Sequence, residues 1–279
     1  MEYNIFDITK GLFTFATTKK RTDMKIAIIG AGNMGGAIAR GLAKTVKETN
    51  ITVSNPTAAK LERLKKEFPS IRTTASNSEA AKDADIIVLA VKPWLVEEVI
   101  KEIMPTERQI LVSVAAGIET GELETMSGNK GMTIFRVIPN TAIAQMESTT
   151  IIASRNATAG QEEMIVSLFA GMGLTFVVPE KQMAAATAMT SCGIAYALKY
   201  IQAVTQAGIE LGIKPDIGMK MVAQSMKGAA ELILQNTTHP AVEIEKVCTP
   251  GGITIKGVNS LEADGFTAAL INAVKITAK

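Results

Sequence analysis

A glycine-rich turn constrains the fold of this chain more than any other feature. The run Ile26-Ala27-Ile28-Ile29-Gly30-Ala31-Gly32-Asn33-Met34-Gly35 has G-x-G-x-x-G spacing, directly after a strand-like run and before a helical pattern. Gly30 permits a tight turn, Gly32 lets backbone approach a pyrophosphate, and Gly35 allows close packing of helix on sheet. A helix N-terminus then offers free amides and its positive dipole end. In this context a dinucleotide site is favoured over a turn without a ligand, and its predicted residues are Gly30, Gly32, Asn33, Met34 and Gly35.

Strand-like runs and helical patterns alternate from residue 25 onward. Short β-branched runs predict strands at 25–29, 51–54, 71–73, 86–89, 110–113, 132–137, 149–153 and 175–178. Helical patterns lie between them at 34–47, 58–68, 78–82, 93–103 and 161–170. This alternation predicts an α/β fold, a Rossmann-type doubly wound parallel sheet covered on both faces, over residues 24–178.

The pattern changes after Pro179. Ala, Met and Gly dominate residues 181–211, and the middle of this segment carries almost no charge. A helix that is apolar nearly all round must be buried, and in a region of about a hundred residues it is usually buried against another subunit. Residues 179–279 are therefore predicted to form an all-α dimerisation and substrate domain. We expect a homodimer, or an oligomer of such dimers.

Residues 1–23 precede Met24, at which the first strand of the predicted sheet begins. They include Lys19, Lys20 and Arg21 but no clean apolar core followed by a cleavage site, so they make a poor signal peptide. A transit peptide is a weaker alternative. We expect an extension outside the folded domains, either translated from an upstream start codon or frayed.

Composition excludes several function classes. The net charge of +2 and the lack of a basic stripe argue against nucleic acid as a partner. No apolar run is long enough to span a bilayer, so no membrane association is expected. Two cysteines in 279 residues make no disulfide framework, which favours a reducing, cytoplasmic setting. A single histidine, His239, argues against a His-rich metal site, and no metal is predicted.

The ends of the later strands add candidate cofactor contacts. Ser54 and Asn55 follow the second strand, where an NAD-specific site usually carries an acidic residue, so NADPH is predicted, with NADH as the alternative. Two further runs at the carboxyl edge of the sheet are predicted to contact the cofactor, namely Ala90, Val91, Lys92 and Pro93, and Ala115, Ala116 and Gly117. Asn140 can bind a carboxamide or a substrate group, although Asn–Thr after Pro is also ordinary turn chemistry.

The run Val247-Cys248-Thr249-Pro250-Gly251-Gly252-Ile253-Thr254 precedes a helical segment at 255–261. Its proline and glycines expose backbone amides before the helix, an arrangement suited to a small carboxylate. A capped helix start without a ligand explains the same residues equally well. As a substrate site, the run contributes Gly251, Gly252 and Ile253, and the hydroxyls of Thr249 and Thr254 lie beside it as candidate catalytic groups.

Together, these motifs give the chain a specific resemblance. The glycine turn, Ala90-Val91-Lys92-Pro93, Ala115-Ala116-Gly117, Pro139-Asn140-Thr141 and the run from Thr249 to Glu262, followed by Gly265-Phe266, occur in the order typical of pyrroline-5-carboxylate reductase. From Met24 to about Val274 the sequence resembles that family. The resemblance implies reduction of 1-pyrroline-5-carboxylate to L-proline, a Rossmann domain, and a helical domain that interlocks two subunits, with the active site between the domains.

Two segments depart from the family pattern. The family usually shows Ser-Gly-Ser-Gly-Pro-Ala-Tyr where this chain has Thr190-Ser191-Cys192-Gly193-Ile194-Ala195-Tyr196, and Asn-Thr-Pro where it has Asn140-Thr141-Ala142. These changes concern a helix start and the packing near the substrate.

The mechanism implied is hydride transfer to the imine carbon, with catalysis mainly from positioning. The Gly251–Thr254 amides would hold the carboxylate of this imine substrate, and Thr254 would bond the ring nitrogen or relay a proton. One alternative is a β-hydroxyacid dehydrogenase-like enzyme with Lys199 as acid and base. The other is a cofactor-binding protein without catalytic activity.

Overall fold

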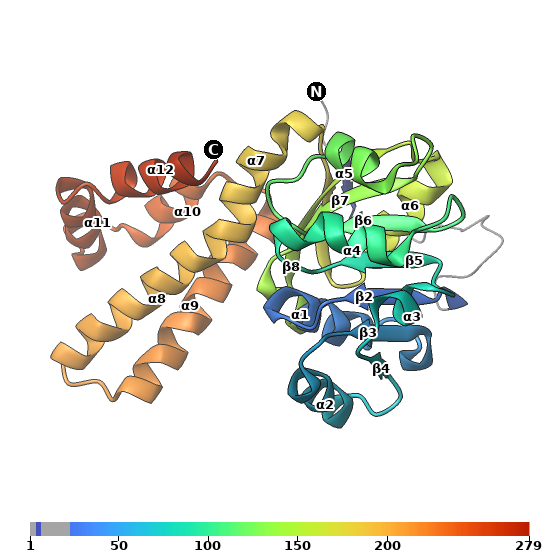
Figure 1. Cartoon of the computed structure of the whole chain (residues 1–279). Helices are drawn as coiled ribbons and strands as arrows, with labels where there is room; N and C mark the ends of the chain where they lie inside the picture. Colours follow the sequence, from blue (N-terminus) through green and yellow to red (C-terminus); the bar gives the residue numbers. More distant parts are fainter. Residues whose placement is uncertain (1–3, 7–22, 279) are drawn as a thin grey trace. The chain divides into compact units, whose positions relative to one another are not determined.

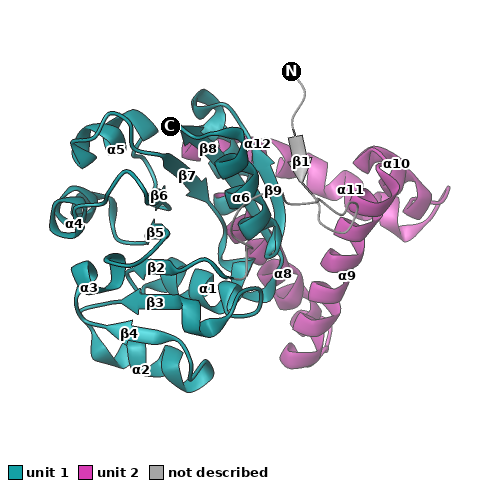
Figure 2. Cartoon of the chain, turned by 90° about the vertical axis from the view of Figure 1, so that its right-hand side faces the viewer, with its two compact units in different colours: residues 1–191 teal, residues 192–279 magenta. Residues whose placement is uncertain are grey.

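The chain forms two compact units, residues 1–191 and residues 192–279 (Figure 2). The coordinates are a computed structural model that describes residues 4–6 and 23–278. The predicted domain boundary at residues 178–179 stays a prediction, and the first compact unit extends beyond it to Ser191. The reason is packing, because Met183 and Ala186, beyond Pro179, join Ile138, Ile151 and Val178 of the sheet in one apolar cluster.

One nine-stranded sheet forms the framework of the first unit (Figure 1). Its spatial order is β1-β9-β8-β7-β6-β5-β2-β3-β4. The strands are β1 (Asn4–Phe6), β2 (Ile26–Ile29), β3 (Ile51–Ser54), β4 (Arg72–Thr74), β5 (Ile86–Leu89), β6 (Ile110–Ser113), β7 (Ile134–Ile138), β8 (Ser148–Arg155) and β9 (Gly173–Val177). The spatial run β7-β6-β5-β2-β3-β4 has the strand order of a Rossmann sheet, and this order reverses at β2.

The doubly wound prediction is confirmed for this part of the sheet. The pairs β2–β3, β3–β4, β2–β5, β5–β6 and β6–β7 are all parallel. Beyond β7 the sheet is mixed, because β8 runs antiparallel to β7 and β9 parallel to β8. Strand β1 falls within the expected extension and pairs antiparallel with β9. The other residues of that extension up to residue 22 lie outside the described residues.

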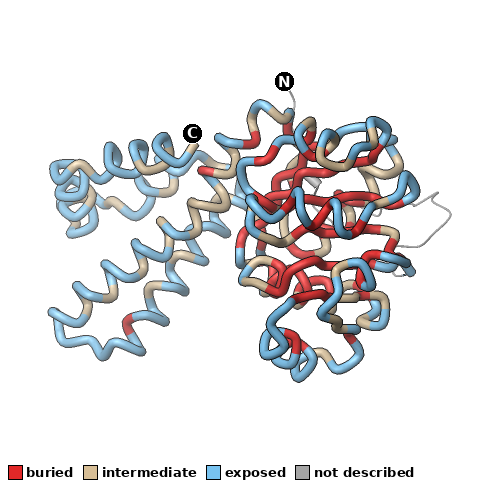
Figure 3. The backbone as a smooth tube through the Cα atoms, in the orientation of Figure 1, coloured by how far each residue is buried: buried red, intermediate tan, exposed pale blue. Residues whose placement is uncertain are grey.

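Helices cover both faces of this sheet. On one face α1 (Asn33–Leu42), α2 (Ala58–Glu67) and α6 (Ala159–Ala170) pack on one apolar cluster. On the other face α3 (Asn77–Ala81), α4 (Val96–Ile103) and α5 (Thr120–Ser127) pack on a second. Figure 3 shows the buried residues concentrated along the strands. Short 3-10 turns η3 (Glu48–Asn50), η4 (Pro93–Leu95), η5 (Thr141–Gln145) and η6 (Glu180–Gln182) complete the unit with α7 (Met183–Thr187).

Helix α5 was not predicted from the sequence. Its start is marked by a capping box in which Glu119 and Glu122 satisfy each other's backbone amides. Only Thr120 and Leu123 of the helix are buried, so its apolar periodicity is too weak to detect.

The second unit is wholly helical in its described part. A π-helical turn, η7 (Ala188–Cys192), leads from the first unit into α8 (Gly193–Glu210). The remaining helices are α9 (Pro215–Asn236), α10 (Pro240–Val247), α11 (Ile253–Ala263) and α12 (Phe266–Thr277). The Tyr196 hydroxyl donates to the Ala273 carbonyl at 3.2 Å and so ties α8 to α12.

This unit buries almost nothing within one chain. Helices α8, α10, α11 and α12 contain no buried residue, and α9 contains only Gly218. Leu198, Met221 and Ile271 are more than half exposed. Apolar surface on this scale marks an interaction site, as expected for a domain whose core is completed by a second subunit.

Candidate cofactor and substrate sites

The glycine turn between β2 and α1 has the geometry predicted for it. Gly30 has a φ of +105°, and a Cβ added there would lie 2.6 Å from the Ala90 carbonyl oxygen. A Cβ added to Gly35 would lie 2.0 Å from the Gly30 carbonyl oxygen. Both contacts are with backbone, which cannot move aside cheaply. These two positions therefore require glycine for steric reasons.

Gly32 has a different environment. A Cβ built there would meet nothing within 4 Å, so the fold itself does not demand glycine. Gly32 is the N-cap of α1, and no side chain caps that helix. Asn33 is exposed and Met34 half-buried in the first turn. Open space before uncapped amides is what an approaching pyrophosphate requires, so the turn fits a dinucleotide.

Ser54 and Asn55 brace this turn from β3. The side-chain oxygen of Asn55 accepts the Ala31 N–H at 3.0 Å, and the Ser54 carbonyl accepts the Gly30 N–H at 2.9 Å. The Ser54 hydroxyl is buried and donates to Asn77 at 2.8 Å. Asn77 in turn donates to Glu102 at 2.7 Å. The Asn55 side chain and the Ser54 backbone carbonyl thus hold the turn in shape, whereas the Ser54 hydroxyl bonds α3.

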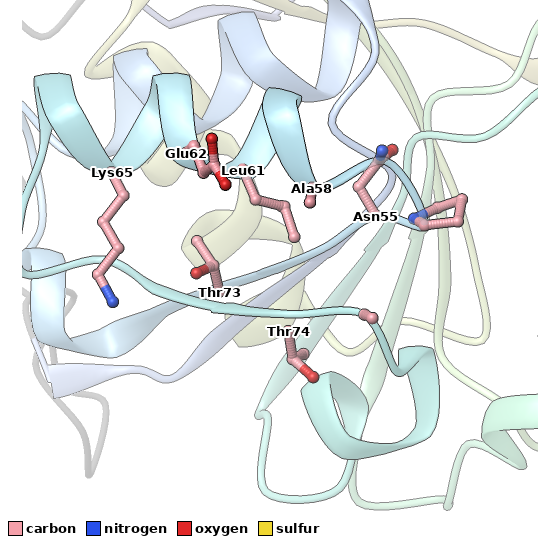
Figure 4. Close-up of a pocket in the computed structure, with 9 residues that line it drawn as sticks. Asn55, Ala58, Leu61, Glu62, Lys65, Thr73 and Thr74 are labelled. Atoms are coloured by element: carbon pink, nitrogen blue, oxygen red, sulfur yellow. The ribbon is translucent and has the colours of Figure 1, made fainter.

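A surface hollow of about 300 Å³ opens beside Asn55, between α2 and β4 (Figure 4). It is lined by Asn55, Pro56, Ala58, Leu61, Glu62, Lys65, Thr73, Thr74 and Ala75. The hollow adjoins the carboxyl end of β3, where the ribose end of a dinucleotide lies in Rossmann folds. Of these residues only Asn55 was predicted, because the others converge from a helix and a neighbouring strand that carry no motif.

The other two cofactor runs also lie at the carboxyl edge. Ala90 follows β5, and both it and Val91 lie against Gly30. Pro93 opens η4, whereas Lys92 is exposed with its Nζ 6.0 Å from the centre of the Trp94 ring. After β6, Ala115 is buried while Ala116 and Gly117 are exposed, and Gly117 has a φ of +80°.

Asn140 follows β7 at the same edge and is only 7% exposed. Its side-chain oxygen accepts the Ala142 N–H at 3.0 Å and so caps η5. The capping role anticipated from the Pro-Asn-Thr sequence is therefore present. This cap uses the carboxamide oxygen of Asn140 and leaves the carboxamide nitrogen available to another partner.

The predicted substrate turn lies in the second unit. Gly251 has a φ of +74°, and the Gly252 N–H donates to the Thr249 carbonyl at 2.9 Å. Gly252 is the N-cap of α11, again without a side-chain cap. Ile253 is 86% exposed, and Thr249 and Thr254 are exposed as well. This stretch thus carries uncapped backbone amides flanked by two exposed threonines, which is compatible with the predicted carboxylate site.

An ion pair connects the two helices that follow the cofactor turn. Arg40 of α1 donates to both carboxylate oxygens of Glu67 of α2, at 2.6 and 2.8 Å. The hydrogen bond from Arg40 lowers the pKa of Glu67 below its ordinary value. At pH values above the ordinary pKa of a glutamate, the ion pair therefore stabilises the fold fully. This stabilisation is lost as the pH falls through the lowered pKa of Glu67.

We expect Glu67→Gln to lower the free energy of unfolding by about 0.5 kcal/mol at neutral pH, a small effect because the pair is partly exposed. The difference from the unchanged protein should shrink as the pH falls below the ordinary pKa of a glutamate and vanish below the lowered pKa of Glu67. Urea unfolding of both proteins across this range measures it. A difference that grows toward low pH would contradict this account.

Comparisons with known proteins agree with this arrangement. Residues 180–279 match the family model described as pyrroline-5-carboxylate reductase dimerisation, and residues 25–117 match that of NADP oxidoreductase, coenzyme F420-dependent. Pyrroline-5-carboxylate reductase 2 of Dictyostelium discoideum is 33% identical over 280 residues, which cover 94% of this chain and 93% of that protein. This chain belongs to the pyrroline-5-carboxylate reductase family.

Other members of the pyrroline-5-carboxylate reductase family match over similar spans of this chain. Pyrroline-5-carboxylate reductase 1 of the same organism is 34% identical over 91% of this chain, which spans 49% of that longer protein. The crystal structure of Plasmodium falciparum pyrroline carboxylate reductase with NADP bound superposes with a TM-score of 0.84 and 30% identity, covering 92% of this chain and 96% of that one. The predicted fold and the predicted helical dimerisation domain are thereby confirmed.

Two further findings concern predicted absences. Within residues 4–6 and 23–278, no helix is both long and apolar enough to cross a membrane. In the same described part, no group of three or more His, Cys, Asp or Glu side chains is arranged to hold a metal ion.

Proposed function

We propose that this chain reduces 1-pyrroline-5-carboxylate to L-proline with NADPH. The observation that carries the proposal is its match, at 33% identity, to 93% of a pyrroline-5-carboxylate reductase. Both the glycine turn of the first unit and the Thr249–Thr254 turn of the second lie within the chain. A binding protein without catalysis has no need of the second turn.

The first unit binds the cofactor. NADPH, when bound, supplies a hydride from its nicotinamide ring. The amides at the start of α1 bind the pyrophosphate, and Gly32 leaves room for it. The carboxyl end of β3 carries the neutral Asn55 where NAD-specific sites place an acidic residue, so a 2′-phosphate meets no repulsion there.

The second unit binds the substrate. The amides of the Gly251–Thr254 turn hold the substrate carboxylate, and the hydroxyl of Thr249 lies beside them. The bound cofactor would supply the hydride for the imine carbon, and the ring nitrogen, already protonated, would become the amine of proline. The Thr254 hydroxyl hydrogen-bonds this nitrogen or relays its proton. The rest of the rate enhancement comes from holding donor and acceptor carbons together.

We expect Thr254→Val to lower kcat/KM by about 100-fold, because it removes the hydroxyl but keeps the shape of the side chain. The assay is the loss of NADPH absorbance with 1-pyrroline-5-carboxylate, beside an NADH control. Turnover by the unchanged chain tests the reaction, and the NADPH to NADH ratio tests the role of Asn55. Intact NADPH binding without turnover would overturn the proposal.

Lys199→Ala is the matched control in the second unit. The dehydrogenase alternative needs this lysine as acid and base, whereas the structure shows it exposed and donating to Gln202 at 3.1 Å on the same helix. We expect Lys199→Ala to retain full activity. Loss of turnover in Lys199→Ala but not in Thr254→Val would favour a β-hydroxyacid dehydrogenase instead.

The active protein is a homodimer through its helical unit, or an oligomer of such dimers. The exposed apolar helices and the match to the dimerisation family support the dimer. A cytoplasmic location stays a prediction, supported by the free thiols of Cys192 and Cys248.

A further inference from the structure

The segment after β7 holds one side chain in a fixed orientation. The Asn140 carboxamide is buried, and its oxygen accepts the Ala142 N–H at 3.0 Å. The Asn140 backbone N–H donates to the Ser148 hydroxyl at 3.2 Å, and that hydroxyl also pairs with Thr150 at 3.1 Å. The Asn140 side-chain nitrogen makes no hydrogen bond with any residue that the structure describes.

The fixed oxygen determines what this side chain can bind. A backbone N–H only donates, so turning the amide round would set its NH₂ against another donor. The Ala142 N–H therefore selects one orientation of Asn140, in which the free group is a donor. Such a group binds an acceptor oxygen and does not accept from a protonated ring nitrogen.

A second contact holds the same segment from the other side. The Ser191 hydroxyl donates to the Pro139 carbonyl at 3.3 Å, across 52 positions of sequence. Ser191 belongs to the π-helical turn η7, a distortion often found at functional sites. Its neighbour Thr190 instead donates to Ala186 within its own helix, at 2.8 Å. Of these two hydroxyls, only that of Ser191 is bonded to the segment that carries Asn140.

We infer that Asn140 binds an acceptor oxygen of the reactants through its Nδ2, and that Ala142 and Ser191 are positioning residues that fix it for this task. The inference rests on the proposed function. The acceptor is either the substrate carboxylate or the carboxamide oxygen of the nicotinamide. These are the two carbonyl-type oxygens attached to the two rings that exchange the hydride. Both positions differ from the family pattern, which has proline in place of Ala142 and glycine in place of Ser191. Proline has no N–H and glycine has no hydroxyl, so neither contact could form with the family's usual residues.

The decisive variant is Asn140→Asp. Its carboxylate still accepts the Ala142 N–H, so the cap and the melting temperature should be kept. The donor is replaced by a negatively charged acceptor, and we expect KM to rise at least tenfold for the reactant that Asn140 contacts. A rise in KM for 1-pyrroline-5-carboxylate identifies the carboxylate, and a rise in KM for NADPH identifies the carboxamide. Unchanged KM for both, with the fold intact, would overturn the inference.

Ser191 is tested by steady-state kinetics of three variants. We expect Ser191→Ala to raise the same KM about threefold with little change in kcat, Ser191→Thr to restore it, and Thr190→Ala, the matched control, to leave it unchanged. An equal rise in Ser191→Ala and Thr190→Ala would show a general effect on η7 and contradict the positioning role. If the unchanged chain turns over no substrate, the proposed function fails, while NADPH binding by Asn140→Asp, read by Trp94 fluorescence, still tests the carboxamide contact.

Discussion

Gly35→Ala is expected to lose NADPH binding, with an affinity at least about 100-fold lower than that of the unchanged chain. The added methyl group would lie 2.0 Å from the Gly30 carbonyl oxygen and 2.9 Å from the Ala90 side chain. Helix α1 must then move away from β2 and β5, which separates its amides from the turn that they form with Gly30. Overpacking of this kind costs about 3 kcal/mol or more, which corresponds to about 100-fold in affinity if the cost falls on the bound state.

The matched control is Gly36→Ala, one residue further along the same helix. A methyl group there would lie 3.1 Å from the end of the Arg40 side chain, which can shift slightly, and 3.9 Å from the Ala31 carbonyl oxygen, an ordinary van der Waals contact. We expect this variant to bind NADPH like the unchanged chain, as measured by quenching of Trp94 fluorescence on titration. Binding by Gly35→Ala within about twofold of the unchanged chain would show that the close approach of α1 to the turn is not needed.

The second large effect is expected from Arg136→Ala, which should lower the free energy of unfolding by about 3–5 kcal/mol. Arg136 of β7 contacts Glu180 at 2.8 Å, and their side chains are 9% and 28% exposed. The second carboxylate oxygen of Glu180 is buried without a hydrogen-bond partner in the described part of the chain. Removing the guanidinium would leave this carboxylate largely buried and unpaired, the costly case for an ion pair.

Thermal unfolding measures this loss, and for a protein of this size we expect a fall in Tm of about 10 °C. The control is Arg155→Ala on the neighbouring strand β8. Its pair with Glu124 has the same 2.8 Å separation, but the arginine side chain is 45% exposed, and Glu124, itself 14% exposed, also accepts a hydrogen bond from Asn156. We expect a smaller change there, because the arginine removed is already solvated and Glu124 keeps the Asn156 donor. Equal shifts for the two variants would show that burial does not decide the energy of these pairs.

Much of the first unit can be predicted from the sequence, because its features are local. The strands at 51–54, 86–89 and 110–113 lie at the positions predicted, since each is a short apolar run between turn residues. The glycine turn can be predicted for the same reason, because the glycines that it requires lie within six consecutive residues. The motif around Thr249–Thr254 likewise lies in one continuous stretch, and its residues form the turn before α11 and the start of that helix.

Only the tertiary structure decided features that join distant residues. The first compact unit extends past Pro179 because Met183 packs on the sheet, and a composition change cannot show such a contact. The contacts of Asn55 with the glycine turn, of Ser54 with Asn77, and of Ser191 with Pro139 are all hydrogen bonds across the fold. Local sequence determines which conformations a segment adopts, but the partner of a polar side chain depends on which strands and helices meet. The sequence thus determined the fold class and the motifs, and packing determined what each of their side chains is free to bind.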